Sequence, residues 1–520
     1  MRSQAGIIAL LSAAVILLAL LLSTRLWVRL DLTRNKAYTI SEVSKRLHRE
    51  IADQVTITYF ISDKLRQAHP MPGEIADLLR EYAAHSRGKI RFIQRDPAKA
   101  GLLQKAEDLG IVPQQIQVVE KNETILATVY TGILIEYLNR ESVIPVVFSL
   151  DTLEYDLSSR IRSLVSNRER ELGVIVGDAH KQWAAEYGLL HRELVFAGFH
   201  LRFLNPGEEI NPMLPALFVF GGAGDLDIQA LYQIDSYIQN GGNVFFAVDA
   251  VAVDTRGSLE ARAVNDQGLL VMLANYGAVL RQAMVLDITA LGLTFQTQSG
   301  FGTITRNIRY PLWIGVQDNA GNKNHPLGAM FRGLDLYWAS PMELSPPPGV
   351  ESEAIFTSTA EAWLQTANFN TNPNFVYMFA EERNATSGVK ILGAVLSGIF
   401  PSAFGHENPQ AKPSRIVVVG DTDFAGPLMQ LNRGEDRNLD FLLKVAEWLS
   451  SDDDIIAIRS REEAGRLDRI TDREKRSAAM SFSRLFNTVF VPLLVAVAGL
   501  VIIGRRRRST ARDRGQAGDV

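Results

Sequence analysis

Two short acidic segments hold the side chains of this sequence that could most readily do chemistry. Asp178 follows a glycine and is followed closely by His180, and Asp421 and Asp423 follow Gly420. Both segments come directly after apolar, β-branched runs that predict strands. Because ligands of open α/β sheets bind beyond the carboxyl ends of the strands, Asp178, His180, Asp421 and Asp423 are the candidate ligand-binding or catalytic residues.

Two interpretations of these residues stay open. Asp421 and Asp423 could hold a hard cation, since Mg²⁺ and Ca²⁺ take oxygen ligands, and the four side chains together would suit a hydrolase if they converged in one pocket. Alternatively, an Asp after a Gly caps the next helix or stabilises a turn. We favour capping, which predicts no catalytic residue, no metal site and no cofactor.

Several function classes are excluded by what the sequence lacks. It contains no G-x-x-x-x-G-K-[ST] string, no G-x-G-x-x-G opening a helix and no H-E-x-x-H. It contains no cysteine, which excludes disulfides, thiolate metal sites and cysteine nucleophiles. The net charge of −4 gives no reason to expect nucleic acid as a partner.

The first part of the chain, residues 36–167, predicts a small α/β domain. A βαβ pattern is followed by a second helix and a strand meander, an arrangement like a thioredoxin-type fold. No redox Cys pair is present, so such a fold would be a scaffold. The predicted strands are 55–62, 89–95, 116–120, 125–130, 132–138 and 143–148; the helices begin at Pro72 and span 98–109 and 155–167.

A second α/β series, residues 168–461, predicts a doubly wound sheet. Apolar runs alternating with amphipathic helices imply parallel strands covered on both faces. The irregular region 250–345 predicts long excursions from the sheet. The predicted strands are 171–177, 200–205, 216–222, 243–249, 391–400, 415–424 and 455–461; the helices are 182–197, 227–240 and 439–450.

Both ends of the chain predict transmembrane helices, at 5–24 and 486–504. Residues 5–22 carry no charge, and about 20 such residues cross a bilayer core. A cleaved signal peptide is the alternative for the first segment, but its apolar run would be shorter. The second span follows a charged linker at 462–485.

The arginines predict the topology. Arg505 to Arg508 follow the second span at once, and positive charge accumulates on the cytoplasmic side. Both termini, including the basic tail 505–520, are then cytoplasmic, and the central domains are extracytoplasmic. Arg25 and Arg29 beside the first span favour the reverse, but large domains translocate largely regardless of such flanks. The tail could also bind anionic lipid headgroups.

Ordered blocks over nearly the whole chain resemble the GldG-like proteins, the auxiliary components of uncharacterised ABC-type transport systems. The blocks include RLDLTRNKAYTIS after the first span, PALFVFGGAGDLDIQALYQIDSYIQNGGNVFFAVDA at 215–250, HPL at 325–327, LGAVLSGIFPSAF at 392–404 and RIVVVGDTDF at 415–424. The resemblance implies ABC permease and ATPase partners that are encoded separately, and links some relatives to gliding motility. It also implies a central domain similar to class I glutamine amidotransferase folds; that enzyme class needs a cysteine nucleophile, so no catalytic residue carries over.

Together these features predict a non-catalytic, membrane-anchored accessory subunit of an ABC transporter in a bacterial cytoplasmic membrane. Its large extracytoplasmic part would bind substrate or partner proteins, and membrane lipids would surround its spans. Two alternatives remain at this stage: a structural envelope or gliding-motility component, and a hydrolase that uses the strand-end carboxylates.

The arginine cluster generates a topology prediction. A reporter that is active only outside the cytoplasm should be inactive when fused after Arg508 and active when inserted in the middle region, because the cluster holds the tail inside. Equal activity at the two sites would contradict the two-span topology. The matched control replaces Arg505 to Arg508 with Gln, which should reduce the difference in reporter activity between the two sites.

Overall fold

The computed structural model describes residues 40–120, 123–150, 153–166, 170–178, 180–255, 257–299, 302–380, 383–405, 408–431 and 435–450. Both predicted transmembrane helices, the predicted strand at 455–461, the linker and the basic tail lie outside these residues. Within the described ranges, no helix combines the length and the apolar character needed to cross a bilayer.

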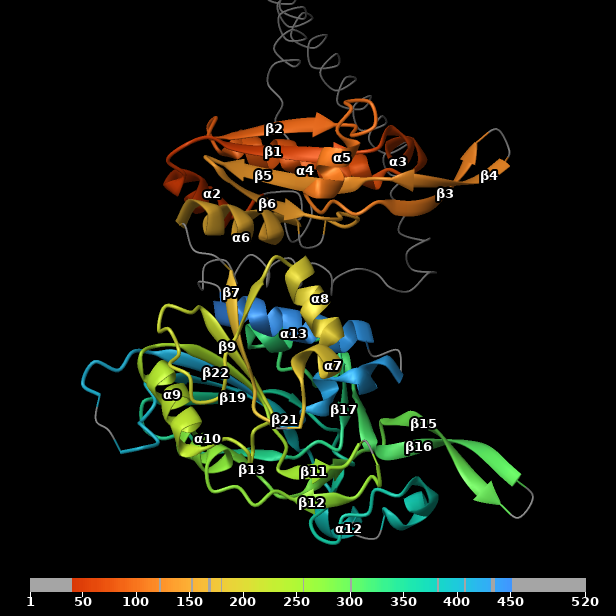
Figure 1. Ribbon diagram of the computed structural model, residues 1–520, viewed down its shortest axis with the longest axis vertical. Coiled ribbons are helices and arrows are strands. Elements are labelled where there is room, and N and C mark those ends of the chain that lie inside the picture. Colours follow the sequence, from red (N-terminus) through yellow and green to blue (C-terminus); the bar gives the residue numbers. More distant parts are fainter. Residues whose placement is uncertain are drawn as a thin grey trace, which may run out of the picture. The chain divides into compact units, whose positions relative to one another are not determined.

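The first part of the described chain forms a four-stranded sheet with helices (Figure 1). The strand order is β2-β1-β5-β6, in which β1 and β2 are parallel and the other pairs antiparallel. The remaining two strands, β3 and β4, pair only with each other. The elements are α2 (Glu42–Glu50), β1 (Val55–Ile61), α3 (Asp63–Ala68), α4 (Met71–His85), β2 (Ile90–Arg95), α5 (Leu103–Asp108), β3 (Gln114–Glu120), β4 (Glu123–Val129), β5 (Thr131–Tyr137), β6 (Arg140–Ile144) and α6 (Leu153–Ser166).

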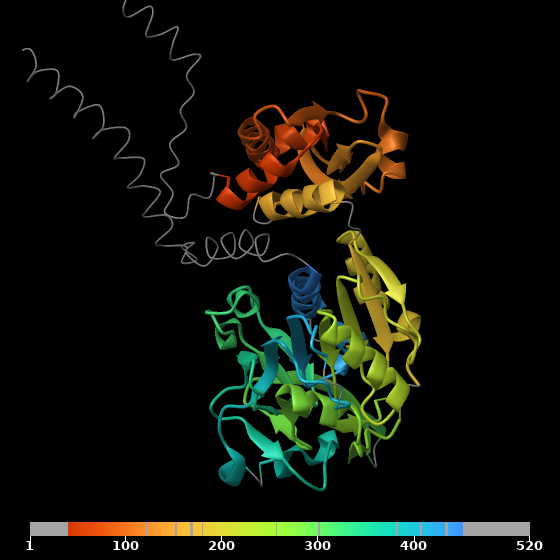
Figure 2. The same cartoon turned by 90° about the vertical axis from the view of Figure 1, so that its left-hand side faces the viewer.

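A buried polar network ties the helices of this part together. Helices α2 and α6 lie side by side (Figure 2). The Glu154 carboxylate on α6 accepts hydrogen bonds from the Ser44 hydroxyl (2.6 Å) and the Ser41 backbone N–H (2.7 Å). Tyr82 of α4 shares a 2.8 Å hydrogen bond with Ser158. Since buried polar groups are costly unless paired, this network fixes the positions of the three helices.

The second part is built on a larger sheet whose parallel core has five strands in the order β8-β7-β9-β10-β22. Successive side chains of β9 point to opposite faces: Phe218 packs with α8 and α13, and Val219 packs with α9 and α10. Helices therefore cover both faces of this core. The elements are β7 (Glu171–Val176), α7 (Trp183–Glu186), α8 (Gly188–Phe196), β8 (His200–Phe203), β9 (Ala216–Phe220), α9 (Ile228–Gln239), β10 (Asn243–Ala247), α10 (Leu269–Tyr276), β22 (Ser414–Val419) and α13 (Glu435–Ser450).

The expectation of an all-parallel sheet was wrong at one side. Strand β21 (Ile391–Gly398) runs antiparallel to β22, and β18 (Met342–Leu344), β13 (Ala278–Leu280) and β19 (Val350–Thr357) add further antiparallel pairs. A parallel return usually needs a helical crossover. The described residues of the β21–β22 connection contain no helix, so the chain returns antiparallel.

The irregular region forms excursions from this sheet. They comprise the pairs β11 (Val251–Val253) with β12 (Ala261–Ala263) and β14 (Met284–Leu286) with β20 (Trp363–Gln365), and the hairpin β15 (Ala290–Ser299) and β16 (Gly302–Val316), which pairs onward with β17 (Leu334–Tyr337). The short helices are η1 (Asp318–Ala320), α11 (Pro326–Ala329), η2 (Pro373–Met378), α12 (Arg383–Thr386), η3 (Asp423–Ala425) and η4 (Pro427–Leu431).

Several predicted boundaries differ from the structure. The single helix predicted at 182–197 is two helices, α7 and α8, which meet at Tyr187 and Gly188. The helix predicted at 98–109 is shortened to α5, and the strand predicted at 143–148 lies earlier, as β6. The break falls at Tyr187, whose φ of −119° and ψ of 23° are not helical; Gly188, a weak helix former, begins α8.

Close packing at the carboxyl ends of β7 and β9 generates a stability prediction. A Cβ on Gly177 would lie 2.6 Å from the Gly222 Cα atom. Gly177→Ala should therefore force the two backbones apart and lower the free energy of unfolding by about 1–3 kcal/mol, measured by chemical denaturation of the detergent-solubilised chain. The control is Gly73→Ala in α4, where a Cβ meets nothing within 4 Å. Equal stability of the two variants would contradict the close-packing argument.

Candidate functional site

The carboxyl ends of three parallel strands bring four carboxylates to one edge of the larger sheet. Asp178 follows β7, Asp249 follows β10, and Asp421 and Asp423 follow β22. Strand β9 lies between β7 and β10 and ends in Gly221 and Gly222. A Cβ on Gly221 would lie 3.3 Å from the Cβ atom of Asp178, so the glycines let the strand ends approach closely.

Lys181 neutralises part of this charge. Its ammonium lies 3.1 Å from Oδ1 of Asp423 and 4.0 Å from Oδ2 of Asp178. Burial alone would lower the pKa of Lys181, but Asp423, Tyr187 and Asp249 raise it more, and the net direction is upward. The side chain is only 18% exposed. Lys181 therefore stays charged and links Asp178 and Asp423.

Asp421 is fully buried and its carboxylate is used by the backbone. Oδ2 accepts a hydrogen bond from Tyr337 N–H (2.6 Å), while Oδ1 accepts from Asp423 N–H (2.7 Å) and Phe424 N–H (3.2 Å). Burial, followed by Asp249 and Asp423, raises the pKa of Asp421 well above its ordinary value. This arrangement joins β17 to the end of β22 and caps η3, in keeping with the capping interpretation.

Asp249 was not among the residues predicted from the sequence. Its Oδ1 accepts a hydrogen bond from Thr422 N–H at 2.9 Å. Burial and the neighbouring Asp423 raise its pKa to about 6, although Lys181 acts in the opposite direction. The sequence signal that could have found it is the third apolar strand that ends in an aspartate, NVFFAVD at 243–249.

Asp178 and His180 are linked through the backbone of His180. Oδ1 of Asp178 accepts a hydrogen bond from the backbone N–H of His180 at 2.8 Å, as in an Asx-turn. His180 itself is exposed. The structure thus brings Asp178 and Asp423 together at Lys181, while it uses Asp421 as a backbone acceptor and leaves His180 at the surface.

Metal binding finds little support at this edge. Over the part of the chain that the structure describes, no group of three or more His, Asp or Glu residues is placed to hold a metal ion. The lysine ammonium lies between two of the carboxylates, where a cation would otherwise neutralise them. What the arrangement can do chemically is to bind the ends of the strands to one another.

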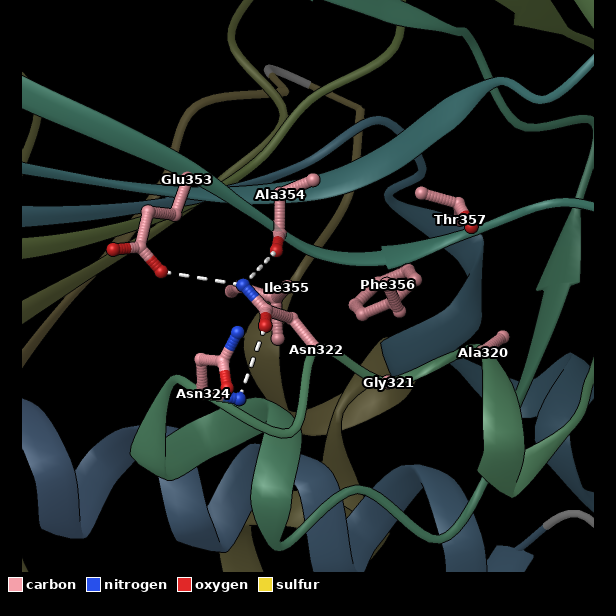
Figure 3. Close-up of a pocket in the computed structure, with 9 residues that line it drawn as sticks. All are labelled: Ala320, Gly321, Asn322, Asn324, Glu353, Ala354, Ile355, Phe356 and Thr357. Atoms are coloured by element: carbon pink, nitrogen blue, oxygen red, sulfur yellow. Dashed lines mark hydrogen bonds between the residues drawn. The ribbon is translucent and has the colours of Figure 1, made fainter.

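An open pocket of about 520 Å³ lies elsewhere, beside β19 (Figure 3). The loop before α11 forms its opposite wall: Gly321 makes a β-bridge to Phe356, and Asn322 N–H donates to the Ile355 carbonyl at 2.7 Å. The Asn322 amide also donates to Glu353 and to the Ala354 carbonyl, both at 3.2 Å. The pocket offers amide, carboxylate and backbone groups for binding.

A second pocket, of about 360 Å³, lies in the first part of the chain and is mostly apolar. It shares no residue with the strand-end carboxylates, so the described chain offers binding surfaces apart from that edge. Its lining residues are Leu65, Ala68, His69, Met71, Pro72, Ile75, Ile116, Gln117, Val147 and Phe148.

Comparison with known proteins gives matches over both parts. Residues 169–445 match the family model described as "ABC-type uncharacterized transport system", and residues 34–136 match a domain of unknown function, DUF7088. A Borreliella burgdorferi protein, titled "Uncharacterized protein", is 25% identical over 497 residues, which cover 92% of this chain and 94% of that protein.

Likeness to solved structures is weaker. The mmIFT52 N-terminal domain matches with a TM-score of 0.33 and 12% identity, over 54% of this chain and 97% of that one. A putative ThuA-like protein from Parabacteroides merdae matches with a TM-score of 0.28 and 13% identity, over 55% and 91%. At these scores the likeness carries no argument about fold or function.

The pKa of Asp249 generates a prediction of pH dependence. Because the folded-state pKa of about 6 lies above the ordinary 3.8, the folded chain binds this proton more tightly than the unfolded chain. The free energy of unfolding therefore falls as the pH rises from about 4 to about 6. Asp249→Asn keeps the acceptor for Thr422 but cannot ionise, so it should weaken this dependence and raise the free energy of unfolding at pH 7 by about 1–3 kcal/mol.

Chemical denaturation of the full chain in detergent between pH 4 and pH 7 measures this effect. The control is Asp225→Asn, since Asp225 is exposed, and it should leave the pH profile unchanged. Parallel profiles for the wild type and Asp249→Asn would show that the Asp249 carboxyl is not the titrating group.

Proposed function

This chain belongs to the family described as "ABC-type uncharacterized transport system", and from that premise we propose that it is a non-catalytic accessory subunit anchored in the membrane. Membership of this family supports an accessory role in an ABC transport system and implies partner permease and ATPase subunits. The GldG-like sequence blocks support the narrower proposal that these partners are encoded separately.

One observation carries the non-catalytic part of the proposal. The edge at which α/β sheets usually bind ligands has its carboxylates engaged internally: Asp421 by three backbone N–H groups, Asp249 by Thr422, and Asp423 by Lys181. A catalytic acid or base must instead be within hydrogen-bonding reach of a substrate. This arrangement supports a scaffold whose work is binding.

The anchoring part of the proposal rests on the sequence. The apolar segments 5–24 and 486–504 and the arginines that follow the second one support a two-pass topology with extracytoplasmic central domains. The strand order β2-β1-β5-β6, with β1 and β2 parallel, supports a thioredoxin-like first domain. The helix-covered parallel core supports the proposed amidotransferase-like second domain, which would act as a scaffold.

Co-purification tests the proposal. The full-length tagged chain, extracted in mild detergent, should retrieve both the permease and the ATPase of its transport system. A Lys181→Arg variant, which keeps the positive charge among the strand-end carboxylates, should retrieve them as well, because this side chain contacts no partner subunit. An unrelated two-span membrane protein with the same tag is the control. Recovery of neither subunit, even after cross-linking, would contradict the accessory role.

A further inference from the structure

The β15–β16 hairpin projects away from the other elements of the second part of the chain (Figure 1). We call its residues 293–308 the arm. The two strands stay paired along the arm, from Leu293 opposite Ile308 outward to Ser299 opposite Gly302. At the base, Leu293 and Ile308 still pack against the hydrophobic core. Beyond them, residues 294–297 and 302–307 are exposed or half-buried.

The register divides the arm into two unlike faces, because directly paired residues share a face. Phe295 lies opposite Arg306, and Thr297 opposite Ile304, on the same face as Leu293 and Ile308. An apolar stripe therefore continues from the core along one face of the arm. The opposite face is polar and uncharged, with Thr294, Gln296, Thr305 and Asn307.

The polar face forms a hydrogen bond between its own side chains, whereas the apolar face leaves a large apolar side chain exposed to water. Asn307 donates a hydrogen bond to the Thr294 hydroxyl at 2.8 Å, a cross-strand contact that water also tolerates. On the other face Ile304 is 48% exposed. A two-stranded ribbon in water is only marginally stable by itself, and burying one side chain of this size favours an association roughly tenfold or more. The apolar face is thus the one a partner would cover.

The charge of the arm indicates which chemical groups a partner surface would carry. Residues 288–317 contain no Asp or Glu, and their charged residues are Arg306 and Arg309. Arg309 donates to the Ala290 carbonyl. Arg306 is exposed on the apolar face and has no hydrogen-bond or ion-pair partner among the described residues. A surface complementary to Arg306 and the apolar stripe would carry a carboxylate beside an apolar depression.

A protein fits this chemistry better than a lipid surface does. Anionic lipid binding typically uses clusters of four to eight basic residues, each contributing only about fivefold to the binding constant. The arm offers one unpaired arginine. Interface cores, in contrast, are enriched in aromatic residues and arginine, which is the composition that Phe295, Ile304 and Arg306 present together.

We propose that the arm docks this chain onto the permease of the same transport system, at a surface that presents carboxylates around an apolar depression. The inference rests on the proposed function, and it identifies which surface of the chain makes the contact. The apolar stripe would enter the depression, Arg306 would pair with a carboxylate, and the polar face would remain toward water.

Neighbouring residues on opposite faces provide the test. A photo-activated cross-linking amino acid is placed in the full-length chain at Ile304 and, as the matched control, at Thr305. The chain is co-expressed with tagged permease and ATPase. Ile304 should give an adduct with the permease, and Thr305 should give at least fivefold less. An adduct of the chain with itself, an adduct with lipid alone, or equal yields at the two positions would overturn the proposal.

A second measurement separates this proposal from the proposed function. The double variant Ile304→Ser with Arg306→Glu should reduce recovery of the partner subunits at least tenfold, whereas Thr305→Ser should not. Unchanged thermal unfolding of both variants, expected because Ile304 lies beyond the core contacts, excludes misfolding. Full recovery by the double variant would contradict docking through the arm while leaving the accessory role intact. Failure of the wild-type chain to recover either subunit would remove both.

Discussion

Four carboxylates at one edge of a sheet can be held together only if their charge is compensated, and much of the larger sheet's structure depends on this. Lys181, 3.1 Å from Asp423, supplies one compensating charge. Backbone N–H groups supply the rest, above all the three that surround Asp421. Because these donors come from β17 and η3, while Asp421 itself follows β22, the arrangement fixes where the irregular excursions meet the parallel strands. The glycines at the ends of β7 and β9 permit the close approach.

The same compensation bears on what the protein does. Asp421, Asp249 and Lys181 make contacts between strand ends, which favours other surfaces of this chain for the proposed binding role. The pocket beside β19 and the apolar pocket in the first part of the chain lie apart from these carboxylates. The arm presents an apolar face with an unpaired arginine. Such surfaces suit a protein that positions other subunits and leaves the energy-consuming step to an ATPase.

Local patterns in the sequence predicted many of the longer strands and helices outside region 250–345, but not how the strands pair. The run ALFVFGG at 216–222 reads as a buried strand because it is apolar on both faces, and Phe218 and Val219 are indeed buried on opposite faces of β9. Strand direction is not encoded in such a run, so the antiparallel β21 could not be foreseen. Asp421 accepts a hydrogen bond from the backbone of Tyr337, 84 residues earlier in the chain, and such a distant contact cannot be predicted from the local sequence. The two-faced arm was hidden in a region whose Gly and Asn content predicts only irregular structure.

The most direct measurement is a structure of the complete chain bound to its permease and ATPase. The account predicts that the apolar face of the arm, with Ile304 and Arg306, is buried against a carboxylate-bearing surface of a partner subunit, and that Lys181 still joins Asp178 and Asp423 with no ligand between them. A substrate seated among Asp178, Lys181 and Asp423, with the arm free in solvent, would contradict it.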